Sequence, residues 1–97
     1  MRLPKTINVG KDRYHVLQPA TNPTDYHGTC NYWTQIIRVY KTSRQGRKYN
    51  SDERSETFWH ELTHAILKDM DSPLERDEAF VTAFAKRLSK SIKSAEF

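Results

Sequence analysis

The spacing of the apolar residues changes near residue 50 of this chain. Before that point, Ile7 and Val9 alternate with polar residues, and Tyr14 and Val16 do the same after the turn-forming Gly10-Lys11-Asp12. A period of two is typical of a strand buried on one face, because successive side chains point to opposite sides. These two stretches and their turn predict a β-hairpin.

Three further segments complete the N-terminal half. Prolines, asparagines and a glycine recur in residues 19–31, which predicts a loop. Residues 32–40 are rich in β-branched and aromatic side chains and predict the best-defined strand. Residues 41–50 are basic and contain no apolar residue except Tyr49, so we expect an exposed connection there.

Beyond residue 50 the apolar residues recur with the period of a helix. Phe58, Leu62 and Ala65 fall on one stripe, three and four residues apart. Two glutamates place negative charge in the first turns, where it complements the helix dipole. The pattern predicts a helix over residues 52–70. Its candidate N-cap residues are Asn50, Ser51 and Asp52.

A second helix start follows a tight turn near Asp71. Ser72 is a candidate N-cap, Pro73 suits the first helical position, and Glu75 can close a capping box. A helically spaced apolar stripe then predicts a helix over residues 73–93. The stripe consists of Phe80, Val81, Phe84, Leu88 and Ile92. Strands followed by helices predict an α+β fold, with a small antiparallel or mixed sheet packed on two helices.

The length of 97 residues allows a single domain, with a β-rich part at residues 1–50 and a two-helix part at residues 51–97. Cys30 is the only cysteine, which excludes a disulfide scaffold and suits a reducing cytoplasm. We expect its thiol to be a small buried apolar group rather than a metal ligand. A domain of this size buries little apolar surface, and a metal ion is one way to stabilise it.

Charge and hydropathy restrict the partners. No stretch reaches the ~18 apolar residues of a membrane span, and no signal-peptide pattern is present, so we expect a cytoplasmic protein without membrane contact, as a monomer or weak dimer. The net charge is +4, and basic residues gather at 41–54 and 86–93. Such clusters can contact phosphates, but no zinc-finger spacing or aromatic RNA-binding signature accompanies them. The sequence therefore does not favour a nucleic-acid partner.

The sequence His60-Glu61-Leu62-Thr63-His64 reads H-E-x-x-H in the middle of the first predicted helix. Residues four apart share one helix face, so His60 and His64 can hold one metal ion. Glu61 is rotated by about 100° from His60 and can polarise a water beside the ion without being a ligand. The alternative is a pair of solvated histidines on a polar helix face.

A catalytic zinc site needs a third protein ligand. A metzincin would have glycine at position 67 and histidine at position 70, but Leu67 and Met70 occupy them, and no histidine follows His64. The remaining candidates are acidic: Asp69, Asp71, Glu75, Asp77 and Glu78. We favour Glu78, which flanks the apolar stripe of the second helix, and keep Glu75 as the alternative. Glu78 could also be a solvated carboxylate that stabilises the helix start.

The H-E-L-T-H-A at residues 60–65, followed after a short turn by D-E-A-F-V-T-A-F-A at residues 77–85, resembles the zinc-binding core of the ImmA/IrrE-type metallopeptidases. It is equally similar to minigluzincins and other short zincins encoded by phages or prophages. The resemblance extends over residues 52–92. Thr63 departs from it, since ImmA/IrrE members commonly have a small residue before the second histidine. These members also usually continue into further helices or a sensory domain.

The resemblance implies a minimal zincin fold in which His60, His64 and Glu78 bind Zn²⁺ and Glu61 is the general base. It implies a zinc-dependent metalloendopeptidase of gluzincin type that acts on a protein or peptide substrate. The alternative is a zincin-fold protein with little or no catalysis, which acts as a binding or regulatory module in a phage or mobile-element setting. A third, minor hypothesis is a basic nucleic-acid-associated domain.

A zincin also needs an edge strand that aligns the substrate and a group that stabilises the oxyanion. We expect the edge strand around residues 35–38. Candidate electrophiles are His27, Tyr26, His15 and Tyr40, although the position of His27 in a loop also suits a plain surface residue. We expect Trp33 and Trp59 to belong to the core rather than to bind substrate.

Overall fold

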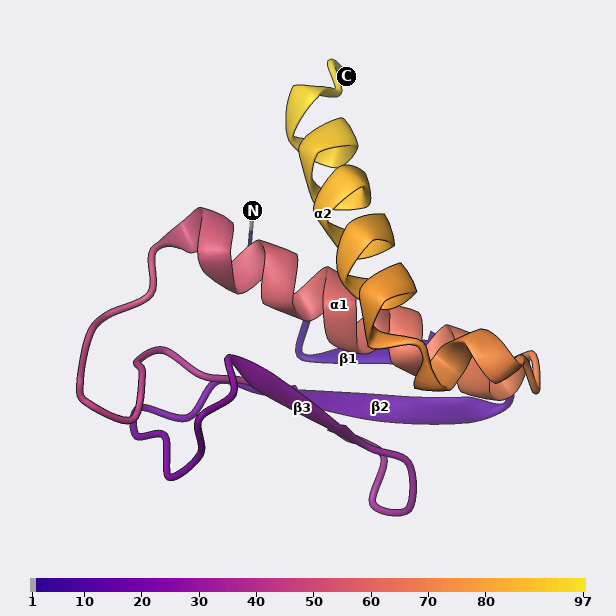
Figure 1. Cartoon of the computed structure of the whole chain (residues 1–97), viewed down its shortest axis with the longest axis horizontal. Helices are drawn as coiled ribbons and strands as arrows, with labels where there is room; N and C mark the ends of the chain where they lie inside the picture. The colour runs from indigo at the N-terminus through magenta and orange to yellow at the C-terminus, as the bar shows by residue number, and fades with distance from the viewer. Residues whose placement is uncertain (1) are drawn as a thin grey trace.

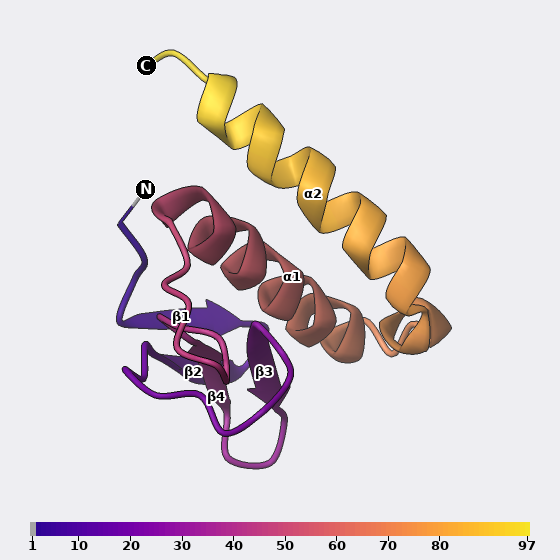
Figure 2. The same ribbon diagram turned by 60° about the vertical axis from the view of Figure 1, so that its left-hand side comes forward.

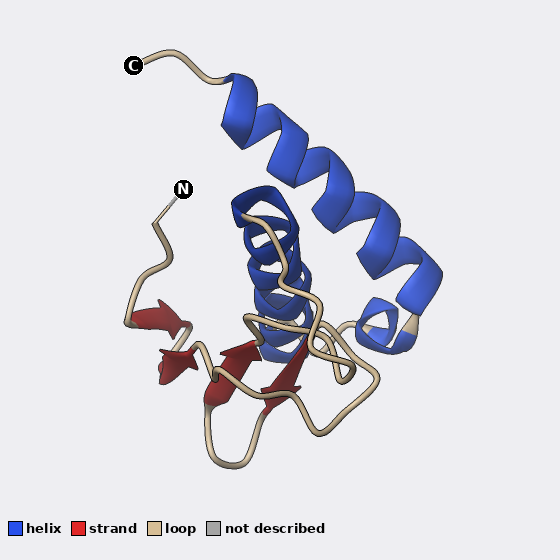
Figure 3. Cartoon of the chain, turned by 90° about the vertical axis from the view of Figure 1, so that its left-hand side faces the viewer, coloured by secondary structure: helices blue, strands red, loops and turns tan. Residues whose placement is uncertain are grey.

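The computed structural model describes residues 2–97 (Figures 1 and 3). Four strands in the N-terminal half precede two α-helices and one short 3₁₀ helix. In chain order the elements are β1 (Thr6–Val9), β2 (Asp12–Leu17), β3 (Gly28–Asn31), β4 (Ile36–Val39), α1 (Ser51–Asp69), η1 (Pro73–Arg76) and α2 (Glu78–Ser94). None of the helices in this described range is long and apolar enough to cross a membrane.

The four strands form one mixed sheet in the order β1-β2-β4-β3. The β1–β2 and β3–β4 pairs are antiparallel, whereas β2 and β4 are parallel. The predicted N-terminal hairpin is confirmed, and Gly10 adopts a φ of 58° in its turn, a conformation that glycine reaches without strain. The predicted α+β class with a mixed sheet is also confirmed.

The second half of the sheet differs from the prediction. The segment 19–31 was expected to be a loop but ends in β3, and the strand expected over 32–40 is only β4. Residues between them form a turn, because the Asn31 side chain accepts hydrogen bonds from the backbone N–H groups of Trp33 and Thr34. Consequently β4 is an interior strand, and the edge strand expected around residues 35–38 is instead β3.

Helix α1 packs its apolar stripe on one face of the sheet. Phe58, Leu62 and Ala65 meet a layer of side chains from β1, β2 and β4, which consists of Val9, Tyr14, Val16, Ile37 and Val39. The helix begins after Asn50, which forms a capping box with Glu53. It ends before Asp71, whose φ of 53° allows the Ser72 N–H to reach the Leu67 carbonyl. The predicted helix over 52–70 is confirmed to within one residue at either end.

The helix predicted over 73–93 is divided in two. Ser72 does cap a helical start, but only that of η1, and the chain leaves the helical conformation at Asp77, which then caps α2 through the Phe80 N–H. Helix α2 packs on the side of α1 that faces away from the sheet, so α1 is the middle layer (Figure 2). Val81 and Ala85 are its buried residues.

Two expectations about large side chains are wrong. Trp33 lies in the β3–β4 turn and is 95% exposed, because this turn projects beyond the sheet. Phe84 is partly exposed and stacks on Phe80 instead of entering the core. Trp59, in contrast, packs against the core cluster as expected. The basic connection 41–50 is largely exposed, with Tyr49 buried.

Candidate metal centre

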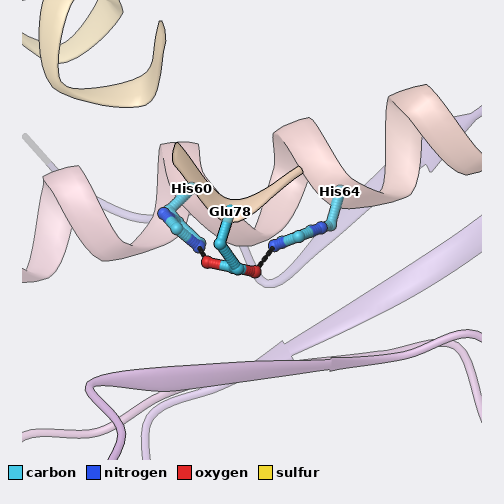
Figure 4. A group of neighbouring side chains, drawn as sticks. All are labelled: His60, His64 and Glu78. Atoms are coloured by element: carbon cyan, nitrogen blue, oxygen red, sulfur yellow. Dashed lines mark ion pairs between the residues drawn. The ribbon is translucent and has the colours of Figure 1, made fainter. Parts of the chain in front are cut away.

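Helix α1 presents His60 and His64 on one face, one turn apart. Their ring centroids are 5.0 Å apart, a spacing that follows from the helical repeat. Both rings are partly buried. The Nε2 atoms of the two rings face the same space, where a third group can join them (Figure 4).

That third group is Glu78, the first residue of α2. Its Oε1 lies 2.7 Å from the Nε2 of His64, and its Oε2 lies 3.2 Å from the Nε2 of His60 (Figure 4). Asp77 fixes the start of α2 and thereby directs Glu78 towards α1. One candidate ligand atom from each of the three residues lies within 4.8 Å of the other two. The structure thus brings together the two histidines and the favoured acidic residue.

A hydrogen bond to the backbone orients His64. Its Nδ1 lies 2.9 Å from the carbonyl oxygen of Glu75, which can only accept, so Nδ1 carries a hydrogen. In neutral His64 the Nε2 lone pair then points at the carboxylate of Glu78. Such a contact is repulsive unless a proton or a metal ion lies between the two atoms.

The three donors fit zinc. Two imidazole nitrogens and one carboxylate oxygen are a ligand set typical of catalytic zinc, which leaves a fourth position for water or substrate. Ligand atoms around a tetrahedral zinc ion lie about 3.3 Å apart, close to the spacings of Glu78 from His60 and His64. Burial lowers the pKa of His60, although the carboxylate of Glu78 opposes this change, so burial favours the neutral form that a metal ion requires.

Tyr32, in the β3–β4 turn, helps to hold His64 in this orientation. Its hydroxyl donates a hydrogen bond of 2.7 Å to Oε1 of Glu75 and so ties the β3–β4 turn to η1, whose backbone holds His64. Burial, followed by the bond to Glu75, raises the pKa of Tyr32, which keeps its hydroxyl protonated as a donor. Tyr32 is therefore a positioning residue for His64, one of the three candidate ligands.

The other acidic candidates for the third ligand lie outside the cluster of His60, His64 and Glu78. Glu75 accepts the hydrogen bond from Tyr32, and Asp77 caps α2. Asp69 lies against Gly10, at the point where a Cβ on that glycine would collide with its carboxylate. Asp71 lies in the turn after α1.

Glu61 lies beside the three-residue cluster and is only 8% exposed. Strand β3 covers it closely: a Cβ on Gly28 would lie 2.5 Å from Cγ2 of Thr57 and 3.4 Å from Cγ of Glu61, both on α1. Glycine is therefore required where β3 crosses α1. Burial, followed by the nearby charge of Glu78, raises the pKa of Glu61 to about 8. No hydrogen bond to its side chain occurs within residues 2–97, which leaves the carboxyl group available to a ligand in the cleft.

A cleft of about 440 Å³ opens in front of the cluster. Its wall consists of Asp25, Tyr26, His27, Gly28, Glu53, Glu56, Thr57, His60, Glu61, Glu78 and Thr82. Two of the four candidate electrophiles, Tyr26 and His27, thus line the cleft, whereas His15 and Tyr40 do not. His27 is exposed and stacks on the ring of Tyr49 with a centroid distance of 4.5 Å.

Cys30 is partly buried and packs against the core, in agreement with an apolar role. Burial, followed by the charges of Glu61 and Glu75, raises the pKa of its thiol to about 12. The thiol therefore stays protonated at neutral pH, which is the unreactive form.

Sequence reasoning did not single out Tyr32 or Gly28 as parts of the site. Tyr32 was assigned to a strand, and its partner Glu75 lies 43 positions away, a pairing that no local pattern reveals. Gly28 was counted only as a loop residue. A glycine at this position indicates a close approach of the strand to α1, but this can be inferred only once the position of the helix is known.

No protein-family model, curated protein or solved structure matches the chain.

Proposed function

We propose that this protein is a zinc-dependent metalloendopeptidase of gluzincin type. The observation that supports this most strongly is the convergence of His60, His64 and Glu78 beside the buried carboxyl group of Glu61. A purely structural metal site would need the three ligands but has no use for a buried, unpartnered carboxyl group in the adjoining cleft. The resemblance of residues 52–92 to small zincins points to the same activity.

Each residue then has a distinct role. His60, His64 and Glu78 hold Zn²⁺, and Glu75 and Tyr32 orient His64. Zinc held there would supply a Lewis acid that polarises the scissile carbonyl and acidifies the attacking water. Glu61 accepts the proton of that water and passes it to the leaving amine. A dication beside Glu61 would lower its raised pKa, because a positive charge favours the carboxylate.

The surroundings suit an extended peptide substrate. Strand β3 is an edge strand, and its first residue, Gly28, lines the cleft. An edge strand offers unpaired backbone groups that can align a peptide by adding it as a further strand. Tyr26 and His27 line the same cleft and are the two side chains best located to stabilise an oxyanion. The lone cysteine suits a cytoplasmic setting for this chemistry.

A second candidate is a zinc-binding protein that acts by contacting a partner. The ligands come from both α1 and α2, so an ion would join the two helices whether or not it catalyses a reaction. In this case the ion contributes stability, as in small zinc-dependent domains. The resemblance to phage-encoded zincins suggests a regulatory partner in a phage or mobile element.

Zinc content and cleavage separate the two candidates. We expect one zinc per chain by elemental mass spectrometry, loss of that zinc in Glu78→Ala, and cleavage of a peptide library by the parent. Glu61→Gln should retain zinc but lose at least 100-fold in cleavage rate, the usual contribution of a general base. Zinc binding without any cleavage by the parent would leave the second candidate. Absence of zinc binding would overturn both.

A further inference from the structure

Some carboxylates of the cleft have a positively charged partner that neutralises their charge, and others do not. The wall contains five acidic side chains and no lysine or arginine. Asp25 lies 3.4 Å from Arg44, and Glu53 forms two hydrogen bonds with Arg47 and caps α1. Each of these pairs is neutral as a unit. A zinc ion would likewise balance Glu78 and Glu61, so these four carboxylates contribute no net charge.

Glu56 is the remaining carboxylate, and it is unpaired. Within residues 2–97, no nitrogen of lysine, arginine or histidine lies within the 4.0 Å that defines an ion pair with it. Lys86 and Lys90 share a groove with Glu56 on its other side but do not reach it. The side chain is partly buried and lies one helical turn before His60 on α1.

The position of Glu56 on α1 sets its distance from the candidate metal centre, where the scissile bond of a substrate would lie. It precedes His60 by four residues on the same face of α1, which corresponds to about 6 Å along the helix axis. Neighbouring residues of an extended peptide are about 3.3 Å apart. For a peptide that runs through the cleft along α1, a side chain about two residues from the candidate metal centre is therefore level with Glu56.

We propose that Glu56 is a specificity residue of the cleft and selects peptides with a lysine or arginine within about two residues of the scissile bond. This inference rests on the proposed peptidase function. An incoming cation would supply the one charge that the cleft lacks. A hydrogen bond to a charged group in a partly buried site corresponds to about a 10-fold to 100-fold preference over an uncharged side chain.

The test uses the zinc-loaded full chain and a peptide library, with cleavage sites read by mass spectrometry. We expect the parent to prefer lysine or arginine near the cleaved bond at least 10-fold over norleucine or glutamine, and Glu56→Gln to lose that preference while it still cleaves uncharged peptides. Glu56→Lys should favour acidic residues instead. Asp52→Asn is the matched control, because Asp52 lies one turn earlier on α1, outside the cleft, and already pairs with Lys93.

The outcomes separate this inference from the function on which it rests. Cleavage without a preference for basic residues, or with the same preference in Glu56→Gln, overturns the role of Glu56 but leaves the peptidase intact. If the parent cleaves nothing, binding of fluorescent lysine-containing and norleucine-containing peptides to the zinc-loaded chain decides the matter. Tighter binding of the lysine peptide that Glu56→Gln abolishes supports the charge selection without catalysis, and equal binding of the two peptides overturns it.

Discussion

The two ends of the α1–α2 pair are built differently. At the closed end, near the turn that joins the helices, Val81 and Ala85 are buried against α1, and His64 and Glu78 meet across the interface. At the open end, Ile92 is 39% exposed and Phe97 is fully exposed, and a groove of about 470 Å³ lies between the helices. The ion pair between Lys93 and Asp52 bridges this end, at the surface.

The difference shows that side chains are more tightly packed at the closed end than at the open end. The candidate metal site lies at the closed end, where η1, the β3–β4 turn and the buried residues of α2 restrict the side chains together. An exposed ion pair such as that of the open end contributes little to stability. We therefore expect substitutions at the closed end to have large effects and equivalent substitutions at the open end to have small ones.

The largest effect is expected for Glu61→Gln in chelator-treated, ion-free protein. Burial raises the pKa of Glu61 from its ordinary 4.5 to about 8 in the folded state. Because the folded-state pKa is the higher one, ionisation of Glu61 costs stability as the pH rises from 4.5 to 8. The variant lacks this cost. Its free energy of unfolding should exceed that of the parent by on the order of 5 kcal/mol above pH 8 and equal it below pH 4.5.

Urea unfolding between pH 4.5 and pH 9 measures this difference. Asp52→Asn is the control from the open end, and we expect it to change stability by less than about 0.5 kcal/mol because its side chain is exposed. A difference between Glu61→Gln and the parent that does not vary with pH would contradict the assigned burial of the carboxyl group.

A pair of alanine substitutions compares the packing of the two ends directly. Val81 is completely buried at the closed end, whereas Ile92 at the open end is larger but partly exposed. Val81→Ala should lower the free energy of unfolding by about 2 kcal/mol, since it leaves a cavity, and Ile92→Ala by less than about 1 kcal/mol. Equal losses in denaturant unfolding would show that the open end is packed as well as the closed end.

The smallest effect is expected for Tyr32→Phe, which removes the hydrogen bond to Glu75 and keeps the ring. Substitution of such outer residues typically lowers metal affinity about 10-fold, and we expect this loss in a zinc titration against a competing chelator. Tyr26→Phe is the control, because no hydrogen bond from that hydroxyl occurs in the described residues and the ring lines the cleft. Equal affinities of Tyr32→Phe and the parent would remove Tyr32 from the support of His64.

The sequence patterns predicted the elements that depend on local signals. The N-terminal hairpin follows from alternation around Gly10, and α1 follows from its apolar stripe and the cap at Asn50. The four-residue spacing of His60 and His64 likewise ensures a shared face once the helix forms. These features need only residues that are close in the chain.

Features that depend on tertiary contacts were missed or misplaced. Strand β3 has little intrinsic strand propensity and forms because it pairs with β4 and lies against α1. Residues 32–35 have strand-forming side chains, yet Asn31 turns the chain there. The apparent capping box of Ser72 and Glu75 does not form, because Glu75 is held by Tyr32 and Asp77 caps the longer helix.

The parallel pairing of β2 and β4 has a consequence for how this molecule can be altered. Parallel strands require a crossover between them, and here the crossover consists of residues 18–35, which include β3 and no helix. Asn22 anchors the loop by donating hydrogen bonds to the carbonyls of Tyr26 and Thr42. Thr24 belongs to the same anchor, because its N–H and its hydroxyl both donate to Oδ1 of Asn22, whereas Pro23 and Asp25 are exposed. Lengthening a loop costs little additional closure entropy. Insertions beside Asp25, which lines the cleft, can therefore reshape its rim while α1 and α2 keep His60, His64 and Glu78 in place, so recognition can be altered independently of the candidate metal site.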